Sequence, residues 1–231
     1  MMNSEYASML KSILGLRYEP VAVKLIQKDE SDPVGYSVPE KQMSHCQAVM
    51  AAKAGSSMYI SAEMQGCNNG ASALGIKGAS EKLLSGEFYY GFGMHDSQEA
   101  AKSMVATRTE LPQIYKGEIV TPLKDANFTP DAVIIVDVPE VIYWFVSLQT
   151  FSKGGRAKFV TAPFQAVCVD ATAYPVQESE INISLGCFGC RKKTDIRKDE
   201  LLVGFPGNRL EEITIALKKY SEDVLTKAKR D

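Results

Sequence analysis

The most regular pattern along the chain is a continuous apolar run at Asp131–Val138. An unbroken run of this length is typical of a central strand that is covered on both faces. Pro139 suits the first turn of a helix, which we expect to continue to about residue 152. Because this helix is apolar nearly all round, we predict that it is buried between the sheet and a partner or a second copy of the chain. A further strand is expected at 156–160, so that 131–160 would form a βαβ-like unit.

Shorter patterns predict the remaining elements. Helical periodicity is found in five segments, namely 4–15, 45–54, 79–84, 97–108 and 209–228. Strand-like segments occur at 21–26, 58–60, 117–123 and 181–184, and from about 199 onward. The aromatic stretch 88–96 is interpreted as a core strand with a bulge at its glycines, and 28–40 and 63–75 are predicted loops. This pattern favours an α/β fold, with α+β as the alternative, in which one mixed sheet is flanked by helices within a single domain, 1–231.

Composition narrows the class of protein. The chain has 231 residues, is 45% hydrophobic and 23% charged, and carries a net charge of −2. These values are ordinary for a globular protein with a hydrophobic core, and the absence of a basic block disfavours nucleic-acid binding. No apolar run approaches the roughly 18 residues of a membrane span, so no membrane association is expected. The N-terminus lacks the pattern of a signal peptide, and we therefore expect a cytoplasmic protein.

The C-x-x-C motif formed by Cys187 and Cys190 is the strongest chemical signal. Two thiolates at this spacing can reach one metal centre, and Gly186 and Gly189 allow the tight backbone turn that aims both sulfurs inward. The cationic run Arg191–Lys193 is expected to lower the pKa of the neighbouring thiols. Because disulfides are uncommon in the cytoplasm, metal binding or catalysis is the favoured interpretation of the five cysteines.

Two upstream cysteines lie in settings that suit the same site. Ser44 is a candidate N-cap, which would place Cys46 in a first helical turn where the macrodipole favours the thiolate. A buried helical cysteine is the alternative at this position. Cys67 lies in a loop rich in glycine and asparagine, whereas Cys168 is flanked by valines and is interpreted as a buried apolar residue. We predict that four cysteines converge on one site, namely Cys46, Cys67, Cys187 and Cys190.

The two histidines of the chain offer little additional chemistry. His95 stands beside Asp96 and is a candidate base or ligand, but a structural role is the favoured interpretation of this single residue. A histidine-rich zinc site or a histidine-based triad would need more such residues.

Five stretches in this order resemble one protein family. They are Pro20–Leu25, Cys46–Gly55, Cys67–Gly75, Gly186–Arg191 and Phe205–Arg209. Together they resemble the domain-of-unknown-function family 169, also called ArCR, of archaea and bacteria. The resemblance spans nearly the whole chain and implies a single α/β domain, but it implies no activity. It also implies cysteines at positions 46, 67 and 187, and a fourth ligand at position 190 that only some members share.

Four cysteines can hold either zinc or an iron–sulfur cluster. Structural zinc modules usually pair two C-x-x-C motifs, and this chain has one. Lone cysteines on separated glycine-rich loops favour a [4Fe-4S] cluster, whose negative charge the run Arg191–Lys193 would offset. Without a metal, Cys187 and Cys190 would form a redox dithiol or a structural pair.

Three functions therefore stay open. The first is an iron–sulfur protein of anaerobic redox metabolism that transfers electrons to a partner protein. The second is an enzyme whose cluster, held by Cys46, Cys67 and Cys187, keeps one iron open for a small molecule. Four polar residues are candidates for holding the cluster or an anionic substrate, namely Asn68, Asn69, Arg191 and Arg209. The third is a non-catalytic binding protein with a structural zinc.

Overall fold

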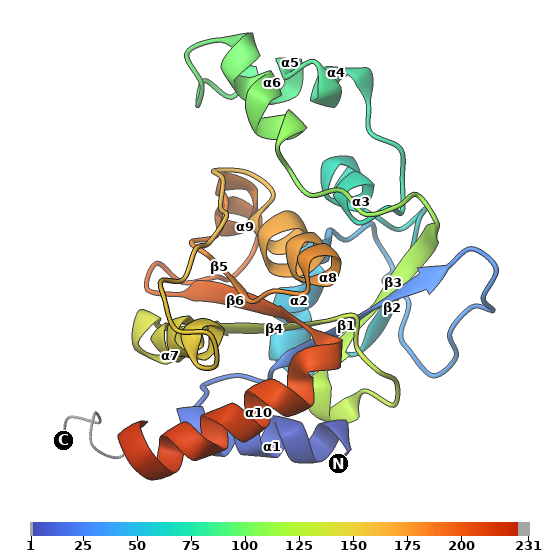
Figure 1. The fold of residues 1–231 in the computed structure, drawn as a ribbon. Helices are drawn as coiled ribbons and strands as arrows, with labels where there is room; N and C mark the ends of the chain where they lie inside the picture. The colour runs from blue at the N-terminus through green and yellow to red at the C-terminus, as the bar shows by residue number, and fades with distance from the viewer. Residues whose placement is uncertain (1, 226–231) are drawn as a thin grey trace.

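The computed structural model describes residues 2–225, and a six-stranded sheet organises them (Figure 1). The strands are β1 (Val21–Gln27), β2 (Met58–Ser61), β3 (Tyr115–Pro122), β4 (Ala132–Asp137), β5 (Asn182–Ser184) and β6 (Leu201–Pro206). Their order in the sheet is β2-β3-β1-β4-β6-β5, and each of these pairings is antiparallel. Among the described residues, parallel pairing is confined to two isolated bridges, Ser37 with Met58 and Met43 with Gln65.

Helices cover both faces of this sheet, which confirms the α/β fold class. The predicted mixture of parallel and antiparallel strands is not found in the described sheet, because all of its strand pairings are antiparallel. The α-helices are α1 (Asn3–Leu14), α2 (His45–Lys53), α3 (Asn68–Ala73), α4 (Glu81–Leu84), α5 (Glu87–Tyr90), α6 (Gln98–Ala106), α7 (Pro139–Thr150), α8 (Tyr174–Glu178), α9 (Phe188–Lys193) and α10 (Leu210–Tyr220). Short 3-10 turns form η1 (Leu123–Asp125) and η3 (Gly207–Arg209), and π-helical segments form η2 (Ala166–Ala173) and η4 (Ser221–Leu225). In Figure 1, α1, α7 and α10 lie on one side of the sheet, α2, α8 and α9 lie on the other, and α4–α6 stand farthest from it.

The apolar side chains of strand β4 explain why helices pack on both faces of the sheet. Val133 and Ile135 belong to the apolar cluster that contains α1, α7 and α10, whereas Ile134 and Val136 belong to the cluster that contains α2 and η2. Successive side chains of a strand point to opposite faces, so a strand between two helical layers must be apolar at every position. The prediction of a central, doubly covered strand is confirmed.

Helix α7 is buried on one face rather than all round. Ile142, Phe145 and Leu148 are buried in the cluster shared with α1 and α10, whereas Tyr143 is more than half exposed. The face of α7 toward the sheet is buried as predicted, whereas a partner or a second copy of the chain against its exposed face stays a prediction.

Two predicted strands are wrong. The stretch 88–96 forms the end of α5 and the turns after it, with Phe88 and Phe92 largely exposed. The segment 156–160 pairs with no strand in the described sheet. Instead, the Asn182 side chain accepts from the Val160 N–H at 2.9 Å and donates to the Val160 carbonyl at 2.8 Å. One side chain thus replaces a neighbouring strand, and the predicted βαβ unit does not form.

Two further predictions need smaller corrections. The predicted loop 63–75 contains α3, which begins directly after Cys67. In the predicted helix 209–228, α10 ends at Tyr220 and η4 continues to Leu225, while residues 226–228 lie outside the described part of the chain. Within residues 2–225, no helix is both long enough and apolar enough to cross a bilayer.

Candidate functional site

All five cysteines line one cavity of about 210 Å³ on the α2 side of the sheet. The structure thus brings together the four cysteines predicted to converge, Cys46, Cys67, Cys187 and Cys190. It adds Cys168, which the sequence suggests is only a buried apolar residue. None of the five forms a disulfide, and their role as metal ligands stays a prediction.

Helix starts surround this cavity. Cys67 is the N-cap of α3, Cys187 is the N-cap of α9, and Cys46 is the second residue of α2. Gln165 precedes η2, in which Cys168 is the third residue. The first N–H groups of a helix have no partner within it, and the helix dipole adds partial positive charge at this end. The helix starts therefore add hydrogen-bond donors and partial positive charge to the wall of the cavity.

Cys187 and Cys190 bond to each other across the first turn of α9. The Cys187 N–H lies 3.1 Å from Cys190 Sγ, and the Cys190 N–H lies 3.4 Å from Cys187 Sγ. The pKa of Cys187 is lowered because the Cys190 thiol and the backbone N–H groups of Cys190, Ala166 and Gln165 donate to its sulfur. The pKa of Cys190 is raised because its thiol is the donor. The low pKa thus comes chiefly from hydrogen bonds, rather than from the run Arg191–Lys193 as the sequence suggests.

Cys46 and Cys168 behave in the opposite way. Burial raises the pKa of Cys46 to about 11, although Ser44 Oγ lies 3.2 Å from its sulfur. The expectation that the start of α2 favours a thiolate here is wrong, because desolvation outweighs the helix end. Burial also raises the pKa of Cys168, with further contributions from Cys67 and Cys187. A coordinating metal deprotonates its thiol ligands, so binding at this site would release protons.

Glycines allow close packing around Cys168. A Cβ atom at Gly70 would lie 3.4 Å from Cys168 Sγ and 3.6 Å from Cys67 Sγ, so both sulfurs lie against the backbone of α3. A Cβ atom at Gly204 of β6 would lie 2.0 Å from the Ala171 carbonyl oxygen of η2. The sheet therefore holds η2, and with it Cys168, at a distance that only glycine permits.

Aromatic side chains surround the opening of the cavity. Phe88, Phe92, Phe164 and Phe188 line it and are called the aromatic rim below. Phe164 is buried and stacks on Tyr89 with 4.1 Å between ring centroids, whereas the other three rings are partly exposed. The sulfurs of Cys187 and Cys190 are buried. The cavity thus has a sulfur-lined floor and an apolar mouth.

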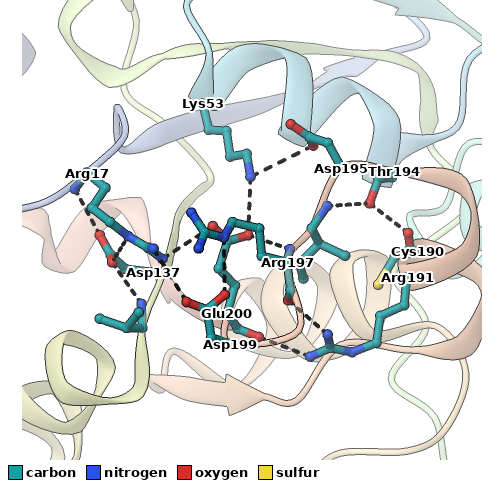
Figure 2. A network of polar contacts seen from close by, with 12 residues as sticks. Arg17, Lys53, Asp137, Cys190, Arg191, Thr194, Asp195, Arg197, Asp199 and Glu200 are labelled. Atoms are coloured by element: carbon teal, nitrogen blue, oxygen red, sulfur yellow. Dashed lines mark hydrogen bonds and ion pairs between the residues drawn. The ribbon is translucent and has the colours of Figure 1, made fainter.

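A buried charge network holds the chain that follows the C-x-x-C motif (Figure 2). The Glu200 carboxylate accepts from Lys53 Nζ at 3.4 Å, from Arg17 Nη2 at 3.3 Å and from the Arg197 N–H at 2.8 Å. The side chains of Glu200 and Lys53 are 0% and 2% exposed. Because Lys53 ends α2 and Glu200 precedes β6, the network ties the segment after α9 to the helix that carries Cys46.

Of the three residues predicted to hold a cofactor, one lines the cavity and two do not. Asn69 lines the cavity. Asn68 is exposed, and its Oδ1 accepts from Lys77 Nζ at 3.1 Å. Arg191 does not line the cavity. Its guanidinium donates to the carbonyl of Leu185 and to those of Arg197 and Glu200, the last two drawn in Figure 2. It fastens the backbone around the motif.

Two other candidates from the sequence lie away from the cavity. Arg209 donates to Glu212 of α10 through Nη2 at 2.8 Å and forms an ion pair with Glu180, which lies just before β5. Its guanidinium is therefore already paired with two carboxylates. His95 lies 6.3 Å from Phe164 between ring centroids, outside the cavity lining. Its Nε2 is buried and has no hydrogen-bond partner within residues 2–225.

His45 is a residue of the site that the sequence does not single out. Its Nδ1 lies 2.6 Å from Glu118 Oε2, its Nε2 lies 2.9 Å from Thr172 Oγ1, and Gln65 donates to Glu118 Oε1 at 2.7 Å. These buried contacts fix the start of α2 beside Cys46. The sequence feature that could have pointed to His45 is Glu118, because a carboxylate inside a buried strand needs a hydrogen-bonding or charged partner.

The cysteines are not gathered around a single point. Within residues 2–225, no group of three or more His, Cys, Asp or Glu side chains is arranged to hold one metal ion. The sulfurs instead surround a space several times larger than the roughly 30 Å³ that one water molecule takes up in the liquid.

One comparison with known proteins gives a family, and another gives a similar protein. The model of domain of unknown function 169, described as uncharacterised ArCR, matches residues 9–215. An uncharacterized protein of Methanocaldococcus jannaschii is 29% identical over 220 residues, which cover 94% of this chain and 94% of that protein. No solved structure matches the chain. Because the family match covers most of its length, the chain belongs to the ArCR family, domain of unknown function 169.

Proposed function

We propose that the cavity binds an iron–sulfur cluster of the [4Fe-4S] type through Cys46, Cys67, Cys187 and one further cysteine. The observation that carries this proposal is the arrangement of the sulfurs. They come from separate segments and surround a cavity of about 210 Å³ without being arranged for one ion in the described residues. A cluster of several iron atoms spans such a space, whereas a single zinc would require the sulfurs to move inward.

The charges around the cavity support the same ligand. A cluster held by four thiolates carries net negative charge, and hydrogen bonds to its sulfurs tune it. The helix starts at the wall and the N–H groups directed at Cys187 provide such donors. Lys192 and Lys193 also line the cavity and would offset negative charge.

Cys190 and Cys168 are the two candidates for the fourth ligand. Cys190 continues the C-x-x-C motif, but its sulfur is engaged with the Cys187 backbone. The sulfur of Cys168 lies against Gly70, as that of Cys67 does. The protein would work in the cytoplasm in anaerobic redox metabolism, either transferring electrons to a partner protein or using an open iron on a small molecule.

Single serine substitutions test this proposal. After anaerobic reconstitution, Cys46→Ser, Cys67→Ser and Cys187→Ser should lose most of the bound iron and sulfide, because each removes a ligand. Of Cys168→Ser and Cys190→Ser, only the variant that removes the fourth ligand should lose iron and sulfide. The other variant serves as the matched control. Circular dichroism checks that each variant is folded. If the first three variants retain the iron of the wild type, these cysteines are not ligands.

Thiol–disulfide exchange is the second candidate function, favoured by the unequal thiols of the C-x-x-C pair. Cys187 has a lowered pKa at the start of α9, and buried Cys190 donates to it. In this mechanism the Cys187 thiolate attacks one sulfur of a substrate disulfide and the second sulfur leaves as a thiolate. Cys190 then displaces the bound substrate sulfur, which leaves the substrate as a dithiol and the protein with a Cys187–Cys190 disulfide.

Alkylation rates separate the second candidate from the first. In metal-free protein at pH 6, iodoacetamide should label Cys187 much faster than Cys46, as followed by peptide mass spectrometry. Cys190→Ala should slow the labelling of Cys187, because the pKa of Cys187 would rise. Equal rates at Cys187 and Cys46 would contradict a reactive dithiol.

A further inference from the structure

The aromatic rim leaves an apolar surface open to solvent. Phe88, Phe92 and Phe188 are 43%, 49% and 42% exposed. The rings are contiguous, with centroid distances of 5.4 Å between Phe88 and Phe92, 5.8 Å between Phe92 and Phe188, and 5.6 Å between Phe92 and Phe164. Three exposed aromatic rings that meet at the mouth of a cavity are a feature of ligand sites, because a flat apolar body can pack on them.

The charged side chains beside the aromatic rim are two lysines, Lys192 and Lys193. No aspartate or glutamate among the described residues lines the cavity, and the low-pKa thiol of Cys187 is buried at its floor. Of the titratable rings in the lining, His45 is paired with Glu118, and burial raises the pKa of Tyr89. Within residues 2–225 neither lysine has a carboxylate within 4.0 Å, and Lys192 Nζ lies 5.7 Å from the centre of the Phe188 ring. Two cations therefore stand beside the exposed rings and can pair with a ligand anion, most strongly in metal-free protein, where no cluster shares their charge.

We propose that this mouth binds a small organic anion with a flat apolar body, of the class of aromatic carboxylates. The rim would hold the body, and Lys192 and Lys193 would hold the charged group through charge-assisted hydrogen bonds. A cavity of about 150 Å³ is enough to admit benzene. In metal-free protein the cavity of about 210 Å³ suits a ligand of about one ring, whereas in protein with a cluster the exposed rings of the rim are the surface left to the ligand.

The anion and a cluster can share this site. The sulfurs of Cys187 and Cys190 are buried at the floor, whereas the rings of Phe92 and Phe188 reach solvent. A ligand on the rim leaves the floor to the cluster and would place its charged group near it. The placement beside a cluster rests on the proposed function, but the binding itself rests only on the rim and the lysines.

Titration with benzoate and benzamide tests the inference, because the two probes share shape and differ in charge. We expect the full chain to bind benzoate with a Kd below about 1 mM and about tenfold more tightly than benzamide, as measured by calorimetry or ligand-observed NMR. Replacing both lysines by alanine should bring benzoate down to the level of benzamide. Lys198→Ala is the matched control, because Lys198 is exposed and does not line the cavity. Phe92→Ala should weaken both probes.

The titration is run on iron-loaded and on metal-free protein, so that two failures stay distinct. Preference for benzoate in either state, lost with the two lysines, supports the inference even if no cluster is ever found. Absence of binding in both states overturns it while leaving the cluster proposal intact. Benzoate binding that is unchanged when both lysines are replaced also overturns the inference, because the anion would then be bound elsewhere.

Discussion

Removing the Glu200 carboxylate should destabilise the protein strongly. Glu200 is fully buried and faces Lys53 and Arg17. Glu200→Ala would leave the ammonium group of Lys53, itself 2% exposed, with one carboxylate among the described residues, that of the largely exposed Asp195 at 3.8 Å, and with the Tyr18 ring 4.3 Å away. Breaking a buried ion pair by removing one partner costs about 3–5 kcal/mol, because the other charge stays buried without compensation.

The expected loss can be measured by urea unfolding. Trp144, the only tryptophan, packs against the core between the sheet and α10, so its fluorescence reports global unfolding. A loss of about 3–5 kcal/mol corresponds to roughly 6–20 °C in Tm, at roughly 2–4 °C per kcal/mol for a chain of this size. Glu200→Gln keeps the shape and should lose a similar amount, because it also removes the charge.

Asp199→Ala is the matched control for this experiment. Asp199 is the neighbouring acid, is half exposed, and contacts the same Arg17 at 3.8 Å. An exposed pair contributes at most about 1 kcal/mol, so this variant should unfold close to the wild type. A loss below about 1 kcal/mol for Glu200→Ala would refute the reasoning, because the network would then add nothing to the attachment of the segment after α9.

Two further substitutions test packing and electrostatics. Gly204→Ala should destabilise the protein by about 3 kcal/mol or more in urea unfolding, because its methyl group would collide with a backbone carbonyl of η2. Gly78→Ala, which meets no atom within 4 Å, should change little, and similar losses for both would contradict the close approach. Burial alone would raise the pKa of Glu19, but hydrogen bonds and charge from Lys11 and Lys124 outweigh it and lower the pKa. The stabilisation from this carboxylate is fully present above its ordinary pKa and is lost as the pH falls through its lowered pKa in the folded protein, so Glu19→Gln should cost up to about 1 kcal/mol at pH 7 and nothing once the pH is below that lowered pKa. A constant cost across this range would show that the loss is not electrostatic.

The sequence correctly predicts those parts of the fold in which a single local pattern determines the structure. The apolar run of β4 and the convergence of Cys46 with Cys187 and Cys190 are found where expected. The predicted strand at 88–96 is wrong, although aromatic residues in general favour strands. Here they belong to the segment that carries α4–α6, and two of them, Phe88 and Phe92, form part of the aromatic rim. Local sequence does not reveal that these rings face the cysteines.

Cys168 shows a second limit of local patterns. Flanking valines predict burial, and burial is correct for Val167 and Val169. In the helical η2, however, Cys168 faces the cavity together with Val167, whereas Val169 does not line it. The strand at 156–160 fails for a related reason, since the side chain of Asn182 provides the hydrogen bonds that a strand would otherwise supply. Both outcomes depend on contacts far apart in the sequence.

Metal analysis of wild-type protein purified without oxygen is the most direct test of the central proposal. Iron, acid-labile sulfide and zinc would be assayed on one sample, together with its visible spectrum. The proposal predicts brown protein with about four iron and four sulfide per chain and little zinc. Colourless protein that neither retains iron nor takes it up on anaerobic reconstitution would contradict an iron–sulfur site at Cys46, Cys67 and Cys187.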